Sequence, residues 1–426
     1  MKRYLLALLL AAALPLRAER VRAIVAVEPP AYSIASVDAI RDGVISTLGT
    51  ASRVERWGAS GTAFSVEVDE SELETLRRDP RVAAVTIDTG GQGSMLESAR
   101  LIGAEKVHEE GIDGRYVTVA ILDTGIDRDN PDFAGRIVAE QCFCDNMDGS
   151  GCCPGGDRVQ SGPGAARDDH GHGTHVAGVL AGGGVYAPKG VAPRANIVAV
   201  KVMDAQNTFR SYTQVYRALE WIILTHPEVQ VINMSLGSRS LYAADACDSS
   251  ALGRGLHEVV AFLRLRGVLI TASSGNEGSI SATTFPACMA EVLGVGATYD
   301  SSGAHSTFCT VANAQADEVA CFSNSNASVD LMAPGATITS SKRGGGTTMS
   351  GGTSMAAPHV AGTIALMKQV SGSLLTAHDV ERILKETGTQ VFDLRNFLVF
   401  PRIDVAAALA ATPRLEPVPR RRSVRH

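Results

Sequence analysis

Two short segments carry the residue types needed for nucleophilic catalysis. Residues 168–178 read DDHGHGTHVAG, which places several imidazoles at the start of a helix-like run. Residues 351–359 read GGTSMAAPH, which places Ser354 after glycines and directly before another helix-like run. A serine hydroxyl is a weak nucleophile until a neighbouring base takes its proton, and histidine does this near neutral pH. The two segments therefore predict a serine nucleophile with a histidine base.

A carboxylate that could orient this histidine stands at the end of a predicted strand. Residues 117–122 (VTVAIL) are mostly apolar, and they stop at Asp123. A buried carboxylate holds the histidine tautomer and stabilises the imidazolium that forms. Two further apolar runs lead to Asn233 and Ser235 and to Asn276. Ligands bind beyond the carboxyl ends of the strands in an open parallel sheet, so these segments are expected to meet at one site.

The elements that must position these residues alternate along the chain between residues 95 and 411. Short β-rich runs are followed by helical patterns, which is typical of a mainly parallel sheet with crossover helices. The chain is therefore assigned to the α/β class. The expected strands are residues 116–122, 195–202, 229–233 and 267–271, and the expected helices are residues 217–224, 252–265 and 354–370.

Residues 19–94 have a different pattern and predict a small α+β unit. Ser71 and Glu74 form a capping box that predicts a short helix through Arg78. Residues 89–94 (TGGQGS) break all periodicity and are expected to be an exposed linker. Strands are indicated at residues 22–28, 63–68 and 82–87.

Residues 1–18 predict export. Lys2 and Arg3 precede an apolar run at residues 4–14, and Ala18 offers a cleavage site. This run is about long enough for a signal peptide and too short to span a bilayer, and the alternative is a buried N-terminal helix. No later run is apolar enough to cross a membrane, so a secreted protein without a membrane partner is expected.

The charge of the chain argues against a nucleic-acid partner. The formal net charge is −6 at pH 7, and no basic patch stands out within residues 19–411. The one basic cluster lies in residues 412–426, a tail rich in Pro and Arg that is expected to be disordered.

Export makes the eight cysteines a question of disulfides. Four of them lie within residues 142–153 (CFCDNMDGSGCC), and four follow later in the chain. The even number suits full pairing, and a zinc site built from the first four is the alternative. The residues by themselves leave the connectivity open. The cysteines are Cys142, Cys144, Cys152, Cys153, Cys247, Cys288, Cys309 and Cys321.

Three blocks of the sequence resemble the signature blocks of the subtilisin family. They are ILDTGID at residues 121–127, HGTHVAG at residues 172–178 and GTSMAAPHVAG at residues 352–362. The resemblance covers about residues 100–410. It implies a three-layer α/β fold with a mainly parallel central sheet and helices on both faces, preceded by a small α+β propeptide.

The resemblance also implies an activity: a secreted serine endopeptidase that hydrolyses peptide bonds of proteins through an acyl-enzyme. Residues 1–18 would be the signal peptide, residues 19–94 an inhibitory propeptide, residues 95–411 the catalytic domain and residues 412–426 the tail. The expected partners are polypeptide substrates and the chain's own propeptide, in a monomeric, self-processing zymogen.

Carried over position by position, the resemblance implies a role for each site residue. Asp123 orients the base, His172 is the general base and Ser354 is the nucleophile. Asn276 resembles the side-chain donor of an oxyanion hole. The residues that resemble a substrate-binding edge are Ser235, Leu236, Gly237 and Gly275.

Other polar residues near these blocks are given structural roles. His170, His175 and His359 are expected to be non-catalytic, and Asp168 and Asp169 are expected to form a solvated acidic turn. Thr284 and Phe285 align with the wall of the pocket for the residue that precedes the cut.

For the cysteines, the resemblance favours a pair between Cys247 and Cys288. A second pair, Cys309 with Cys321, would close a short loop, and the four cysteines at residues 142–153 would then pair among themselves.

No cofactor or metal is expected to be required. Asp132 matches an aspartate that ligates calcium in many relatives, but residues 182–189 lack the expected Asn, and one carboxylate is not a calcium site. A calcium ion held by Asp145, Asp148 and Asp157 is a further alternative.

Two functions of other classes compete with the peptidase. One is an adhesion protein that retains the fold without catalysis. The other is a serine esterase, which would be expected to carry a G-x-S-x-G elbow that the Ser354 segment lacks.

Overall fold

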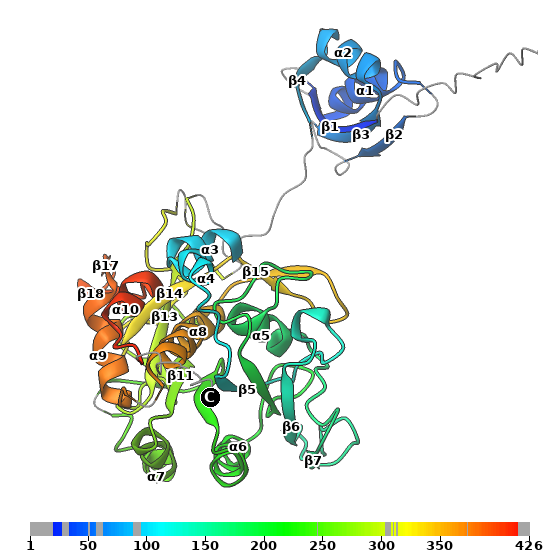
Figure 1. Ribbon diagram of the computed structural model, residues 1–426. Coiled ribbons are helices and arrows are strands. Elements are labelled where there is room, and N and C mark those ends of the chain that lie inside the picture. The colour runs from blue at the N-terminus through cyan, green and yellow to red at the C-terminus, as the bar shows by residue number, and fades with distance from the viewer. Residues whose placement is uncertain are drawn as a thin grey trace, which may run out of the picture. The chain divides into compact units, whose positions relative to one another are not determined.

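The computed structural model describes residues 20–27, 34–49, 52–56, 63–87, 95–244, 246–302, 308–309, 311, 314–372 and 374–415. The expected signal peptide at residues 1–18, the expected linker at 89–94 and the tail from residue 416 lie outside the described residues. The chain divides between Gln92 and Gly93 into two compact units, which Figure 1 shows.

The first unit is a four-stranded antiparallel sheet in the order β2-β3-β1-β4 with two helices. Its core is small and apolar, with Val25, Phe64, Val66 and Leu76 fully or almost fully buried. Its elements are β1 (Val21–Val27), α1 (Ile34–Ile45), β2 (Arg53–Arg56), β3 (Ala63–Val68), α2 (Glu70–Arg78) and β4 (Val82–Ile87).

The capping box of α2 begins two residues earlier than expected. The Asp69 side chain accepts a hydrogen bond from the Glu72 N–H at 3.0 Å, and the Glu72 side chain accepts one from the Asp69 N–H at 3.2 Å. The prediction of Ser71 and Glu74 for this box was therefore wrong. Asp69 is the stronger competitor because its carboxylate carries charge at the positive end of the helix.

The second unit is built on a ten-stranded sheet in the order β17-β18-β14-β13-β11-β9-β5-β8-β6-β7. The pairs from β18 to β6 are parallel, and only the outermost pairs, β17 with β18 and β6 with β7, are antiparallel. Its strands are β5 (Thr118–Asp123), β6 (Ile137–Phe143), β7 (Val159–Ser161), β8 (Asn196–Lys201), β9 (Val229–Met234), β11 (Leu269–Ser273), β13 (Leu293–Tyr299), β14 (Leu331–Ala336), β17 (Thr389–Asp393) and β18 (Leu398–Arg402).

Helices cover both faces of this sheet. The helices are α3 (Met95–Leu101), α4 (Ala104–Glu109), α5 (His172–Ala181), α6 (Tyr212–Thr225), α7 (Ala251–Leu265), α8 (Thr353–Ser371), α9 (Ala377–Thr387) and α10 (Val405–Ala411), with a 3-10 turn, η1 (Pro131–Phe133). Short two-stranded ribbons pair β10 (Leu241–Tyr242) with β12 (Thr283–Thr284) and β15 (Ile338–Ser341) with β16 (Thr347–Ser350).

The two faces have separate cores, which makes the unit three-layered. Alternate residues of β5 point to opposite cores: Ile121 packs in the core that α5 and α8 cover, and Leu122 packs in the core that α6 and α7 cover. Figure 1 shows α6 and α7 beside each other below the sheet. A strand buried on both faces must be apolar throughout, which explains the unbroken apolar run before Asp123. The predicted fold class is confirmed.

Four disulfides use all eight cysteines. Cys142–Cys153 and Cys144–Cys152 lie nested at the end of β6, so the insert pairs within itself. Cys247–Cys288 and Cys309–Cys321 are the pairs favoured above. A zinc site at the first four cysteines is excluded because their sulfur atoms are bonded to each other. Within the described ranges, no helix combines the length and apolar character that crossing a membrane requires.

Candidate active site

Asp123 and His172 meet at the carboxyl edge of the sheet. Asp123 is the last residue of β5 and is buried, and His172 is the first residue of α5. The His172 Nδ1 atom lies 2.7 Å from Asp123 Oδ1, which also accepts a hydrogen bond from the Thr124 N–H at 2.7 Å. Among the described residues, Asp123 Oδ2 is buried without a hydrogen-bond partner. The carboxylate is thus committed to the imidazole and one backbone amide.

This contact sets the protonation of His172. Burial lowers the pKa of the imidazole, whereas the charge and hydrogen bond of Asp123, together with the charge of Asp168, raise it, and the net result is a pKa above the ordinary value. Because Nδ1 faces the carboxylate, Nε2 is the nitrogen that can exchange a proton with another group. The side chain is 11% exposed, so it can be approached from the solvent side.

Asp168 holds the N-terminus of α5, and it was wrongly expected to be solvated. Its side chain is 3% exposed and accepts five hydrogen bonds. Three come from backbone N–H groups at the helix start, and two come from the hydroxyls of Thr124 and Thr174. Gly171, the N-cap, has no side chain to satisfy these groups, so an acidic residue three positions earlier takes that role. A glycine N-cap is the signal that could have identified Asp168.

Asp169 is exposed, as expected, but its carboxylate also has a partner. Its Oδ1 accepts a hydrogen bond at 2.7 Å from the ammonium of Lys201, which is fully buried at the end of β8. Lys201 also donates to the carbonyl oxygens of Thr124 and Met203. This buried lysine therefore ties the turn after Asp123 to the turn before α5, a role that sequence reasoning missed.

Gly173 lets α5 approach the turn after β5. A Cβ at this position would lie 2.0 Å from the Gly125 carbonyl oxygen and 3.0 Å from Asp123 Oδ1. The Gly173 N–H donates to Thr124 Oγ1 at 2.9 Å. Any larger residue would push His172 away from Asp123.

Ser354 stands at the start of α8, in its second position, and is half-buried. Its hydroxyl donates to the Ser235 carbonyl oxygen at 3.4 Å, and the Ser235 hydroxyl donates to the Ser354 carbonyl oxygen at 2.7 Å. In the described part of the chain no hydrogen bond joins Ser354 to His172. Contacts between catalytic groups are commonly long in the absence of substrate, and a hydroxyl changes partner by rotation about χ1.

Asn276 is oriented by the residue that precedes Ser354. Its Oδ1 accepts hydrogen bonds from both the N–H and the hydroxyl of Thr353, at 2.8 and 3.0 Å. The Thr353 hydroxyl also accepts from the Gly275 N–H at 3.1 Å. With Oδ1 occupied, the Nδ2 amide is the end of Asn276 that remains available to a ligand. Sequence reasoning missed Thr353 as a positioning residue.

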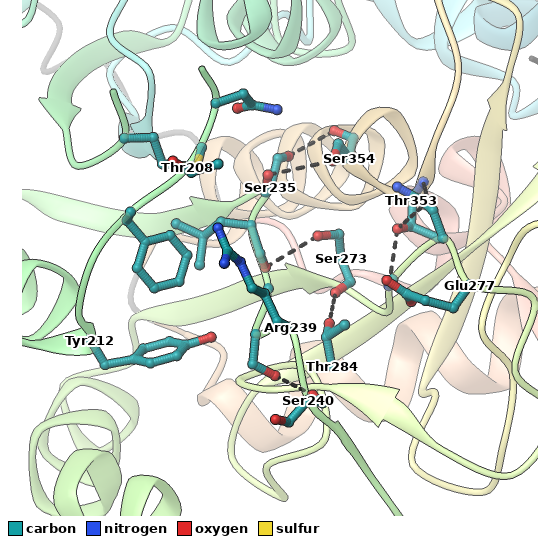
Figure 2. A pocket seen from close by; sticks show the side chains of 18 of the residues that line it. Thr208, Tyr212, Ser235, Arg239, Ser240, Ser273, Glu277, Thr284, Thr353 and Ser354 are labelled. Carbon is teal, nitrogen blue, oxygen red and sulfur yellow. Dashed lines mark hydrogen bonds between the residues drawn. The ribbon is translucent and has the colours of Figure 1, made fainter. Parts of the chain in front are cut away.

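A groove of about 450 Å³ begins at Ser354 and Asn276. Figure 2 shows Ser235, Ser273 and Thr284 around it, with Tyr212 and Arg239 among the residues that line it. The expected substrate-binding residues Ser235, Leu236, Gly237 and Gly275 all line the groove. A volume of about 450 Å³ lies within the range of ligand-binding clefts in proteins.

Thr284 lines the groove, and its hydroxyl donates to the Ser273 carbonyl oxygen at 3.0 Å. Phe285 does not line it. Its side chain is fully buried against Tyr212, with ring centroids 4.9 Å apart, so the expectation for Phe285 was wrong.

Two of the other histidines near the site, His175 and His359, are buried and bonded to backbone. Burial lowers the pKa of both His175 and His359 to about 4. The His175 Nε2 atom lies 3.0 Å from the Ile338 carbonyl oxygen, and the His359 Nδ1 atom lies 2.8 Å from the Met355 carbonyl oxygen. Both imidazoles therefore stay neutral and hold neighbouring backbone in place.

Asp132 does not fit a calcium ion. Its two carboxylate oxygens accept hydrogen bonds from the backbone N–H groups of Val185, Tyr186 and Ala187 and from the Ser341 hydroxyl. A calcium site needs several oxygen ligands, whereas the contacts of the Asp132 carboxylate are three N–H groups and one hydroxyl. The loop carboxylates have other partners: Asp148 accepts a hydrogen bond from the Ser150 N–H, and Asp145 forms an ion pair with Arg158. Among the described residues no group of three or more His, Cys, Asp or Glu could hold a metal.

Comparison with known proteins identifies relatives of this chain. Residues 114–400 match the family model described as the subtilase family. The chain is 35% identical over 269 residues to an intracellular serine protease of Paenibacillus polymyxa, covering 61% of this chain and 69% of that protein. It is 33% identical over 339 residues to an extracellular serine proteinase of Thermus sp. strain Rt41A, covering 76% of this chain and 71% of that protein.

A solved structure is also similar. It is a cold-adapted subtilisin-like serine proteinase, 29% identical in sequence, with a TM-score of 0.52. The match covers 68% of this chain and 90% of that one.

Proposed function

The chain belongs to the subtilase family of serine endopeptidases, and from that premise we propose that Asp123, His172 and Ser354 are its catalytic triad. The observation that carries the proposal is the 2.7 Å contact between His172 Nδ1 and Asp123 Oδ1. This contact supplies the oriented base that a serine nucleophile requires.

The proposed cycle is acyl transfer. The Ser354 hydroxyl turns from the Ser235 carbonyl oxygen to His172 Nε2, gives up its proton and attacks the scissile carbonyl carbon. His172 then passes that proton to the departing amine, which leaves an ester between Ser354 and the acyl half of the substrate. Water, deprotonated by the same imidazole, hydrolyses the ester and restores the hydroxyl.

Asn276 is the proposed side-chain donor to the oxyanion, with the Ser354 N–H as its partner. Support comes from the two hydrogen bonds from Thr353, which occupy Oδ1 and leave Nδ2 to donate. A fixed donor acts on charge that develops only in the tetrahedral adduct. Losing one such donor costs roughly 10²–10³ in kcat, a range measured on subtilisin itself.

The substrate is proposed to lie along Ser235, Leu236 and Gly237 as an added strand. Backbone pairing of this kind recognises extended peptide, with the side chains entering the groove. This arrangement suits cleavage within proteins.

The test of the triad compares the wild type with Ser354→Ala. We expect casein hydrolysis by the variant to fall by about six orders of magnitude, as loss of the nucleophile does in subtilisin. A fluorophosphonate probe should label the wild type only. Hydrolysis of a short-chain ester with no action on casein would instead favour an esterase, and an unlabelled wild type would favour an adhesion protein.

We further propose that the enzyme is exported and made as a monomeric zymogen, with residues 19–94 as its inhibitor. Support comes from the basic and apolar start of the sequence and from the compact first unit, whose boundary with the second unit falls within the expected linker. N-terminal sequencing should find a mature start between residues 88 and 96 in the wild type and not in Ser354→Ala. The same start in both would mean that another protease makes the cut.

A further inference from the structure

The charged residues that line the groove are unequally distributed. Two are basic, Arg210 and Arg239, and one is acidic, Glu277. Glu277 stands next to Asn276, and its Oε2 accepts a hydrogen bond from Asn324 Nδ2 at 2.6 Å. This hydrogen bond holds the Glu277 carboxylate beside Asn276, at the catalytic end of the groove.

The two arginines differ in what surrounds them. Hydrogen bonds from Ser150 are the main cause of the lowered pKa of the Asp148 carboxyl group, and the charge of Arg210 lowers that pKa a little further. Arg239 is exposed, and across the described ranges no carboxylate lies within 4.0 Å of its guanidinium. Arg239 is thus a cation that faces the groove without an intramolecular counter-charge.

The wall beside Arg239 is rigid and uncharged. The Tyr212 hydroxyl donates to the Phe285 carbonyl oxygen at 2.7 Å, and the Tyr212 ring packs edge-on against Phe209 and Phe285 at 4.9 Å. Burial raises the pKa of Tyr212, so its phenol stays neutral. Figure 2 shows Arg239 and Tyr212 together in the groove, with Ser354 and Thr353 across from them. A substrate side chain that enters the groove beside Tyr212 would therefore meet one charged group, the Arg239 guanidinium.

We propose that Arg239 is a specificity-determining residue that selects substrates with Asp or Glu within the four residues before the scissile bond. The proposal rests on the proposed binding of substrate along Ser235–Gly237. Arg239 follows that segment by two residues, and a strand advances about 3.3 Å per residue, so a long arginine side chain covers only a few substrate positions. A guanidinium pairs with a carboxylate through two parallel hydrogen bonds, which an amide of the same shape cannot match.

The chain's own sequence around the expected cut fits this preference. Residues 81–94, which include the expected linker at 89–94, contain a single carboxylate, Asp88. A self-cleavage in the window proposed above, between residues 88 and 96, leaves Asp88 on the N-terminal side of the cut. Selection by Arg239 narrows the expected cut to the bonds after residues 88–91, because only these place Asp88 among the four preceding residues.

The experiment uses the full chain after processing and a set of paired peptides. Each pair carries Asp or Asn at one of the four positions before the cut and is otherwise neutral. We expect kcat/KM to be about three- to tenfold higher for Asp than for Asn at one of these positions, with the ratio falling as salt is raised. Arg239→Ala should bring the ratio to about one, and Arg239→Glu should bring it below one.

The matched control is Arg217→Ala, which removes the same charge from an exposed position of α6 that does not line the groove. It should leave the Asp-to-Asn ratio unchanged. Equal cleavage of both peptides by the wild type at all four positions, with activity that still requires Ser354, overturns the role of Arg239 and leaves the triad intact. Activity that survives Ser354→Ala overturns both proposals.

Discussion

Thr353 and Asn276 are joined by two hydrogen bonds, and both end on the same atom, Asn276 Oδ1. The residue that precedes the proposed nucleophile therefore also aims the proposed oxyanion donor. The same two hydrogen bonds therefore fix both the start of α8, where Ser354 lies, and the direction of the Asn276 side-chain amide.

This relationship predicts the effect of Thr353→Val. The valine keeps the N–H bond and the branched shape but loses the hydroxyl, which leaves Asn276 and the Gly275 N–H with one partner fewer. We expect kcat to fall about tenfold, as the loss of about 1.4 kcal/mol would give, with KM little changed. Steady-state kinetics on a peptide substrate checks this, with Thr353→Ser as the control that should retain most activity. A loss confined to KM would mean that Thr353 serves substrate binding instead.

The raised pKa of His172 predicts the pH dependence of peptide hydrolysis. The imidazole must be neutral to accept the Ser354 proton, so kcat/KM should fall as the pH drops through its pKa. Because Asp123 raises that pKa, the midpoint should lie above about 6.5, the ordinary histidine value. A pH profile with an uncharged peptide measures it, and a midpoint below about pH 6 would contradict the contact with Asp123. In Asp123→Asn, NMR titration of the His172 imidazole should show a lower pKa.

The five bonds to Asp168 predict a loss of stability in Asp168→Asn. Burial raises the pKa of this carboxyl group, but its hydrogen bonds, led by that from Thr174, lower it more, so the net pKa lies below the ordinary value. An amide cannot accept all five bonds, and we expect the free energy of unfolding to fall by about 1.5–3 kcal/mol. Urea unfolding in the Ser354→Ala background, which removes autolysis, measures this loss.

The sign of the pH dependence follows from the lowered pKa of Asp168. The stabilisation is present above the pKa of the unfolded chain, near 4, and is lost as the pH falls through the lower pKa of the folded protein. The difference in stability between wild type and Asp168→Asn should therefore shrink on acidification below about pH 4. A difference that is constant down to pH 2 would show that Asp168 acts through packing alone.

The contacts of Asp132 predict that a chelator has little effect. With both carboxylate oxygens held by N–H groups and a hydroxyl, EDTA should change neither activity nor the midpoint of thermal unfolding. Asp132→Asn should still destabilise the protein, by about 1–3 kcal/mol, because buried backbone donors lose an acceptor. A drop in the unfolding temperature with EDTA that added Ca²⁺ reverses would reveal a calcium site elsewhere in the chain.

The features that were predictable from the sequence are those that depend on local pattern. The four expected strands correspond to β5, β8, β9 and β11 to within two residues at each end, because strands buried on both faces must be continuously apolar. The expected helix at 217–224 is the second half of α6, which begins at Tyr212. Its start was missed because Ser211 caps it with Gln214 as partner, amid polar residues that hide the periodicity.

The residues that sequence reasoning missed depend on tertiary contacts. Asp168 and Lys201 are charged, and charged residues are normally exposed, so burial of both could be recognised only once their partners were in place. In the sequence Thr353 is simply the residue before Ser354. Its hydroxyl orients Asn276 only because the loop after β11 packs against the start of α8. Arg239 belongs to no recognisable motif, and only the structure shows that it lines the groove.

The groups of the proposed site come from the end of β5, the loop after β11 and the starts of α5 and α8, over a stretch from Asp123 to Ser354. No single fragment of the sheet contains all of these groups. A chain that is still being synthesised, or that has lost part of its core, therefore lacks a complete active site. Proteolytic activity therefore requires that the sheet from β5 to β11 and the starts of α5 and α8 have assembled together.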